Sequence, residues 1–265
     1  MMMAFGFSAL LIGKAAAALF EPTALGWRQT YVLLGCLTGA VFAVTALFLR
    51  LPTERDSLPP AAKSVSAGGN DIPSREMVRR ASFYKLFVFF FLLASVGSTA
   101  IGATREIVSA FMSDADGAAA LTVNMVGIVA VMNGLGRLLS GAVYDALGLR
   151  KTQYIASAAG IAAPALTLIA LLTGSLPLGL AGLCLCGISY GFCPTLTAAL
   201  VGGFYGQKHF SLNFSITNLV LIPAAFISTL TAYLNGQTGS LLASFGLLTA
   251  FSVVGLFVNL SIRKA

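Results

Sequence analysis

Residues 133–151 have the sequence NGLGRLLSGAVYDALGLRK. The second half of this stretch has the spacing G-x-x-x-D-x-x-G-x-R-K at the end of an apolar segment. Gly141 lies one helical turn before Asp145 and would let a neighbouring helix approach closely. Asp145 can accept hydrogen bonds from a helix N-terminus or from Arg150 and Lys151, and Gly148 can form a sharp turn. The pattern therefore predicts a charged turn between two apolar helices.

The composition of the whole chain places such helices in a membrane. Of the 265 residues, 57% are hydrophobic, the mean hydropathy is +0.90, and only 25 are Asp, Glu, Lys or Arg. Nine of these charges lie in residues 51–80, so the other 235 residues carry 16. A soluble domain has about a quarter of its residues charged. This excludes a soluble enzyme, a nucleic-acid-binding protein and a disordered chain, and it predicts an all-α membrane protein.

Apolar stretches long enough to cross a bilayer occur eight times, since a spanning helix needs about 20 residues. They are residues 1–20, 29–50, 83–104, 121–144, 154–173, 177–202, 210–234 and 240–261. Residues 51–80 hold Pro59-Pro60 and Gly68-Gly69-Asn70 together with their nine charges, which is typical of a hydrophilic linker. We expect a partial N-terminal bundle of two spans in 1–50, a linker in 51–80, and a six-helix bundle in 81–265.

The loop charges predict the orientation of these spans. Twelve Lys or Arg residues lie on the side of the linker and the C-terminus, whereas only Arg28 and Arg105 lie on the other side. Basic loops stay in the cytoplasm, so we expect a multi-pass protein of the plasma membrane with a cytoplasmic linker and C-terminus. The net charge of +7 then reflects topology, and we expect no nucleic-acid partner.

The charged turn resembles the signature loop of the major facilitator superfamily, which latches helices and gates alternating access. In that family the loop follows the second span of each half, and here it follows the second span after the linker. Several further stretches resemble the oxalate/formate antiporter branch, which is related to the monocarboxylate transporters. They are GWRQTY at 26–31, Phe83-Tyr84, NGLGR at 133–137 and GFYGQK at 203–208.

The resemblance numbers the eight spans as helices five to twelve. Helices one to four would be absent, so we expect the C-terminal part of a longer transporter or a shortened gene product. No basic residue precedes Lys14, which argues against a cleaved signal peptide. The resemblance implies a major-facilitator-like bundle that acts as a transporter and not as an enzyme.

Arg137 is the first candidate for substrate binding, because an arginine within a span is costly and usually faces a cavity. Asn133 lies one turn before it and Ser140 nearly one turn after it, on a shared polar face. A guanidinium can hold a carboxylate through two parallel hydrogen bonds. In the resembled families an arginine in this helix binds the substrate carboxylate. The alternative is that Arg137 joins a cytoplasmic charge network with Asp145, about 12 Å away along the helix.

The sequence differs from the resembled families at two places, and these differences narrow the range of possible substrates. Monocarboxylate transporters have an aspartate at the position of Asn133, where it serves proton coupling. Oxalate carriers have a lysine in helix eleven, but residues 210–233 contain no charged side chain, which favours a ligand with one carboxylate. Lys14 could supply a second cation, since helix five is the counterpart of helix eleven, or it could reach outward to the interface.

The function expected from these residues is secondary active transport of a small organic anion, a monocarboxylate, by alternating access. Protons or a counter-substrate would couple it, as symport or antiport, and the protein would act as a monomer in the lipid bilayer. Another small solute, such as a drug or sugar, and a transport-dead relic or sensor remain as alternatives. His209 is the single histidine, and the cysteines lie in apolar runs, so we expect neither a metal nor another cofactor.

Overall fold

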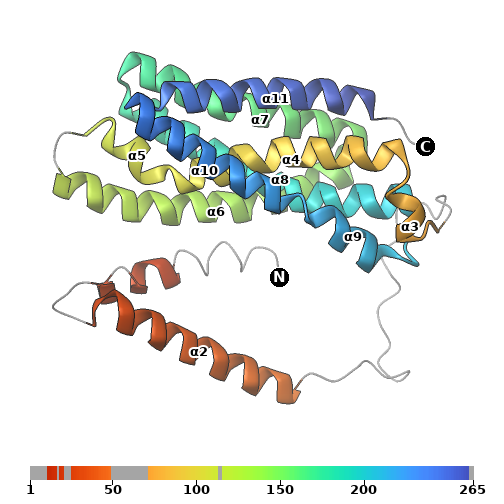
Figure 1. Ribbon diagram of the computed structural model, residues 1–265, viewed down its shortest axis with the longest axis horizontal. Helices are drawn as coiled ribbons and strands as arrows, with labels where there is room; N and C mark the ends of the chain where they lie inside the picture. Colours follow the sequence, from red (N-terminus) through yellow and green to blue (C-terminus); the bar gives the residue numbers. More distant parts are fainter. Residues whose placement is uncertain (1–10, 17, 21–24, 49–70, 113–114, 263–265) are drawn as a thin grey trace.

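A computed structural model of the chain describes residues 11–16, 18–20, 25–48, 71–112 and 115–262 (Figure 1). Every regular element in these residues is an α-helix. The helices are Leu11–Phe20, α2 (Gly26–Phe48), α3 (Ser74–Met77), α4 (Ala81–Gly102), α5 (Thr104–Ser109), α6 (Ala115–Leu147), α7 (Leu149–Thr173), α8 (Leu176–Tyr205), α9 (Phe210–Asn218), α10 (Leu221–Thr238) and α11 (Leu242–Ser261).

Seven of the predicted spans are confirmed as helices long and apolar enough to cross a membrane, with α9 and α10 together forming one of them. The eighth, residues 1–20, is described only from Leu11 onward, because residues 1–10 lie outside the described part of the chain. The all-α bundle predicted from composition is therefore the observed fold. The charged turn separates α6 from α7, as its pattern predicts.

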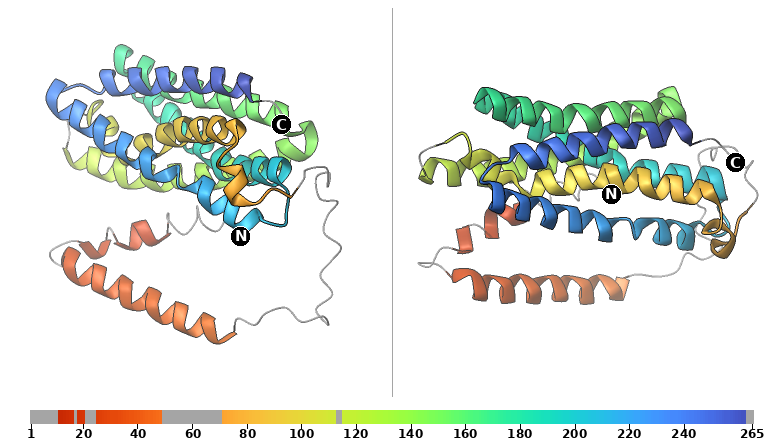
Figure 2. Two further views of the ribbon diagram at one scale, coloured as in Figure 1. Left: turned by 45° about the vertical axis from the view of Figure 1, so that its right-hand side comes forward. Right: turned by 45° about the horizontal axis from the view of Figure 1, so that its top comes forward.

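Helix α8 is the centre of the bundle and packs against α4, α6 and α7, while α11 closes the bundle against α4 and α7 (Figures 1 and 2). Glycines on α8 bring its backbone close to two neighbours. A Cβ atom added at Gly182 would lie 2.9 Å from the backbone nitrogen of Thr167 in α7, and one at Gly187 would lie 2.7 Å from the carbonyl oxygen of Val129 in α6. Membrane helices associate through such small residues, because lipid provides little hydrophobic drive between them.

The span predicted at 210–234 is interrupted between α9 and α10. Pro223 has no N–H to donate and its ring clashes with the carbonyl four residues earlier, which belongs to Leu219. That carbonyl instead accepts from the backbone nitrogen of Ile222 at 3.0 Å, and Val220 donates to Thr217 at 3.2 Å. The proline therefore replaces one helical turn by tighter bonds between residues three apart.

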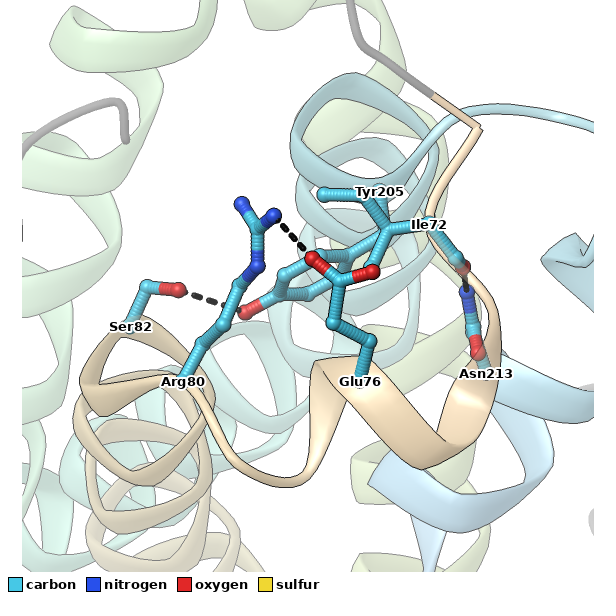
Figure 3. A network of polar contacts seen from close by, with 6 residues as sticks. All are labelled: Ile72, Glu76, Arg80, Ser82, Tyr205 and Asn213. Atoms are coloured by element: carbon cyan, nitrogen blue, oxygen red, sulfur yellow. Dashed lines mark hydrogen bonds and ion pairs between the residues drawn. The ribbon is translucent and has the colours of Figure 1, made fainter.

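Residues 71–80 pack on the bundle although they belong to the stretch expected to be a linker. Ile72 is 4% exposed and Met77 is fully buried, and the backbone nitrogen of Ile72 donates to the carbonyl of Tyr205 at 2.9 Å. The side-chain amide of Asn213 in α9 donates to the carbonyl of Ile72 at 3.0 Å (Figure 3). The hydroxyl of Ser74 donates to the Asn213 side-chain oxygen at 2.6 Å. These residues form a strap, residues 71–80, across the ends of α8 and α9.

The N-terminal helices form a separate hairpin (Figure 2). The hydroxyl of Thr30 in α2 donates to the carbonyl of Leu19 at 3.0 Å, and the rings of Phe20 and Tyr31 lie 5.5 Å apart. The spanning window of α2 has no buried residue, and the helix lies apart from α4–α11 in both views. The hairpin exposes apolar side chains on most of its surface, as expected for a helix that faces lipid or a further helix.

Candidate functional site

Arg137 lies deep in α6, ten residues before the end of this helix at Leu147, or about 15 Å along its axis. Its side chain is half-buried. The other charged residues described between Ala81 and Ser261 lie near a helix end or in a connection. A charge at this depth is costly unless it has a function or a partner.

Asn133 and Ser140 flank Arg137 on the same helix and are buried, with 7% and 0% of their surface exposed. The Oδ1 atom of Asn133 and the Oγ atom of Ser140 have no hydrogen-bond partner among the described residues. Buried polar atoms in proteins nearly always have such a partner. The two atoms therefore offer unused hydrogen-bonding capacity one turn on either side of Arg137.

Close contact between α6 and α8 fixes the backbone around Arg137. A Cβ atom added at Gly136 would lie 2.3 Å from the carbonyl oxygen of Ile188. One added at Gly191 would lie 2.3 Å from the carbonyl oxygen of Asn133 and 2.8 Å from the backbone nitrogen of Arg137. The glycines thus let the two backbones touch, and α8 supports the segment that carries the arginine.

Tyr190 is a site residue that the sequence reasoning missed. A Cβ atom added at Gly97 of α4 would lie 2.3 Å from the Tyr190 Cβ and 2.5 Å from its ring, so the tyrosine packs directly on this glycine. Gly191, the residue after Tyr190, contacts α6, since a Cβ atom added there would lie 2.8 Å from the backbone nitrogen of Arg137. The site thus combines α4, α6 and α8. Gly97 and Tyr190 are each unremarkable in sequence, and only the fold brings them together.

Lys14 lies on the helix Leu11–Phe20, where its side chain is exposed. It makes no hydrogen bond or salt bridge with another residue in the part of the chain that the structure describes. Its role as a second cation stays a prediction.

The charged turn has the predicted backbone but lacks the predicted ion pairs. Gly148 has φ of 77°, in the left-handed region that favours glycine, and its nitrogen donates to the Tyr144 carbonyl at 2.9 Å. Asp145, Arg150 and Lys151 are exposed, and Asp145 has no hydrogen bond or salt bridge to a described residue. Water solvates such exposed charges, so pairing them gains little. The gating role of the turn stays a prediction.

We expected a neighbouring helix to approach closely at Gly141. None of the described helices does so. No described atom lies within 4 Å of a Cβ atom added there. The close approaches occur at Gly136 and Gly191, because α8 crosses α6 nearer to Arg137 than to the charged turn. Within the described part of the chain, no three His, Cys, Asp or Glu side chains are grouped so that they could hold a metal ion.

Comparison with known proteins finds one family, described as Major Facilitator Superfamily, whose sequence pattern matches residues 1–229. The matched range includes the N-terminal hairpin, the strap, α6 with Arg137, the charged turn and all of α8. No curated protein matches the chain.

Proposed function

The chain belongs to the Major Facilitator Superfamily, and on that premise we propose that it carries a small monocarboxylate across the membrane by alternating access. Members of the family are transporters and not enzymes, and this chain is accordingly a secondary transporter of a small solute. The seven helices of spanning length in its described residues make it an integral, multi-pass membrane protein. The monocarboxylate as substrate, and with it the oxalate/formate and monocarboxylate branch, is the proposed part.

The observation that carries the proposal is the position of Arg137 deep in α6, one turn from the buried hydroxyl of Ser140, which has no described partner and can donate a hydrogen bond. A planar guanidinium matches a carboxylate through two parallel hydrogen bonds, and its charge is permanent. The hydroxyl of Ser140 and the Nδ2 group of Asn133 can donate to a bound carboxylate, whereas the Oδ1 atom of Asn133 can only accept. Tyr190 would cover the site from α8, since it precedes Gly191, which contacts the backbone of Asn133 and Arg137.

A ligand with one carboxylate fits the charges better than a ligand with two. Helices α8, α9, α10 and α11 contain no Asp, Glu, Lys or Arg. A second carboxylate would therefore have no cation to hold it on these helices, and leaving it unpaired away from water is costly. Because Asn133 cannot take up a proton, coupling would proceed through a counter-substrate or through a proton carried elsewhere.

We also propose the organisation of the protein in the membrane. Residues 1–50 belong to an N-terminal bundle, 51–80 connect it to the bundle in 81–265, and the connection and C-terminus face the cytoplasm at the plasma membrane. The distribution of loop charges supports this orientation. Exchange between inward- and outward-facing states would involve the charged turn from Gly141 to Lys151, and the transporter would act as a monomer.

Equilibrium binding to the purified full chain tests the substrate class. Propionate, propionamide and malonate have similar carbon frames but carry one, no and two carboxylates. We expect propionate to bind and propionamide to bind at least about tenfold more weakly, because the amide lacks the charge that Arg137 pairs with. Malonate should also bind more weakly than propionate. Equal binding of propionate and propionamide would indicate a neutral substrate, and tighter binding of malonate would indicate a dicarboxylate.

A further inference from the structure

A cavity of about 350 Å³ lies between α4, α5 and α10. It is at the end of α4 opposite to the strap, since α4 begins beside α3 and ends at Gly102 (Figure 1). Four of its lining residues are glycine or alanine, which leaves the space open. The complete lining is Thr99, Gly102, Ala103, Glu106, Ser228, Thr231, Ala232, Asn235 and Gly236.

Glu106 is the only charged residue in this lining. It makes no salt bridge with any residue that the structure describes, and its exposed neighbour Arg105 does not line the cavity. Glu106 and Asn235 also line an adjacent cavity of about 490 Å³, so the carboxylate stands where the two spaces meet. A cavity with one uncompensated carboxylate attracts positive charge.

Two hydroxyl oxygens in the cavity lining can accept hydrogen bonds from a ligand. Thr99 is 2% exposed, and its Oγ1 atom has no hydrogen-bond partner among the described residues. The hydroxyl hydrogen of Thr231 is already donated to the carbonyls of Ile227 and Ser228, at 3.1 and 2.9 Å, so this oxygen can only accept further bonds. Together with the Glu106 carboxylate, these two oxygens can receive hydrogen bonds from a ligand that donates them.

Asn235 has a fixed orientation in this cavity. Its Oδ1 atom accepts a hydrogen bond from the hydroxyl of Ser244 in α11, and the same hydroxyl lies 3.1 Å from the carbonyl of Thr231. These contacts link α10 to α11 behind the cavity and hold the wall in place. This wall of the cavity is thus fixed before a ligand arrives, which lowers the entropic cost of binding.

We propose that this cavity is a second binding site, which takes a small organic cation whose ammonium group is held by Glu106. An ammonium group has three donors and no acceptor, and it matches a carboxylate together with the hydroxyl oxygens of Thr99 and Thr231. A volume of about 350 Å³ is at the lower end for small-molecule sites and far exceeds that of a bare metal ion. The small residues Gly102 and Ala232 leave room for the carbon body of the ligand. The proposal goes beyond carboxylate transport and does not depend on Arg137.

Titration calorimetry on the purified full chain tests the site with n-butylammonium as the probe. We expect saturable binding with a dissociation constant on the order of millimolar, because the carboxylate is partly hydrated. n-Butanol has the same carbon body without the charge and should not bind measurably. Sodium and potassium chloride should neither bind nor displace the probe. Equal signals from butanol, or a Glu106-dependent signal from sodium, would overturn the organic-cation site.

The same Glu→Gln substitution at two different positions tests whether Glu106 holds the cation. Glu106→Gln removes the charge from an exposed side chain and should weaken n-butylammonium binding at least about tenfold. Glu76→Gln is the matched control, since Glu76 is exposed on α3 and does not line the cavity, and it should bind as the wild type does. Unchanged binding in Glu106→Gln would overturn the proposal.

The buried hydroxyl provides a second, independent test. Thr99→Val keeps the shape of the side chain and removes the acceptor, so n-butylammonium binding should fall several-fold. Thr99→Ser keeps the hydroxyl and should bind the probe as the wild type does. Equal binding by all three proteins would exclude a contact with this residue. Arg137→Lys should lose propionate binding but bind n-butylammonium as the wild type does. The two proposed sites can therefore be tested independently.

Discussion

Gly191 of α8 and Asn133 of α6 are in backbone contact, such that a Cβ atom on residue 191 would lie 2.3 Å from the Asn133 carbonyl oxygen. Real Cβ atoms essentially never come this close to another atom. The same added atom would lie 2.8 Å from the backbone nitrogen of Arg137. The size of residue 191 therefore sets the distance between α6 and α8 at the depth of the proposed carboxylate site.

Gly191→Ala should push α6 and α8 apart and displace Arg137. Overpacking of this kind typically costs about 1–3 kcal/mol of stability, because backbone atoms cannot move aside as side chains do. Propionate affinity should fall in the same variant. Thermal unfolding and equilibrium binding of the purified protein measure the two effects.

Gly203→Ala is the matched control for this change. Gly203 lies in the same helix, and no described atom lies within 4 Å of a Cβ atom added there. Alanine is a better helix former than glycine, so this variant should unfold at the same temperature as the wild type or slightly higher. Equal destabilisation of both variants would show that the contact at Asn133 has no special role.

Asn213→Ala should release the strap from the bundle. Asn213 is fully buried and bonds to both the Ile72 carbonyl and the Ser74 hydroxyl, so its removal leaves these groups without a partner. An unsatisfied buried group costs about 1–3 kcal/mol. Limited digestion with trypsin should then cleave faster after Arg75 and Arg79, since cleavage requires local opening of the strap.

The comparison variant for the strap is Asn218→Ala, at the end of the same helix. The side chain of Asn218 is half-buried and has no hydrogen bond to a described residue. Digestion of this variant should proceed at the wild-type rate. If both variants were cleaved equally fast, the hydrogen bonds of Asn213 would not be what holds the strap.

The helices of the fold could be predicted from sequence because each span is a local feature of about 20 apolar residues. The break in the span 210–234 was not predicted, because Pro223 marks the position but a proline can bend a helix without dividing it. The strap was not predictable in this way. Its buried residues Ile72 and Met77 are two apolar side chains within a charged stretch, and only contact with α8 and α9 shows that they pack.

The candidate site was predictable in part. Arg137, Asn133 and Ser140 share a face of one helix, and helical periodicity is enough to group them. Tyr190 packs on Gly97, which lies 93 positions earlier in the chain, and no periodicity joins residues so far apart. Asp145 could accept hydrogen bonds from Arg150 or Lys151 but forms no ion pair with them in the described residues, because charges close in sequence at a helix end can remain separately solvated.

The two ends of the span formed by α9 and α10 should label from opposite sides of the membrane. Lys208 and Thr238 are both exposed, just before and at the end of this span. In a background without the four native cysteines, an impermeant thiol reagent applied to intact cells should label Thr238→Cys and spare Lys208→Cys. Permeabilised cells, in which both should react, are the control. The reverse pattern would contradict the cytoplasmic placement of the strap and C-terminus.

Asn133→Asp should make propionate binding depend steeply on pH. The new carboxylate would lie one turn from Arg137 and compete with the substrate for the guanidinium while it is ionised. Protonation removes this competition, so binding should strengthen as the pH falls, whereas the wild type should change little over the same range. Binding measured across a pH series checks this sign. A flat profile for the variant would show that residue 133 does not face the bound carboxylate.

Arg137→Lys should lose most propionate binding although the positive charge is kept. Lysine is a point charge on a flexible stem and cannot make the planar contact with two hydrogen bonds. Losing one charge-assisted bond costs about 1.5–3 kcal/mol, or roughly ten- to a hundredfold in affinity. Arg79→Lys is the control, because Arg79 is an exposed residue of the strap, and it should bind propionate as the wild type does. If Arg137 only contributed its charge to a cytoplasmic network with Asp145, lysine could replace it. Equilibrium binding of propionate to purified Arg137→Lys would then match that of the wild type.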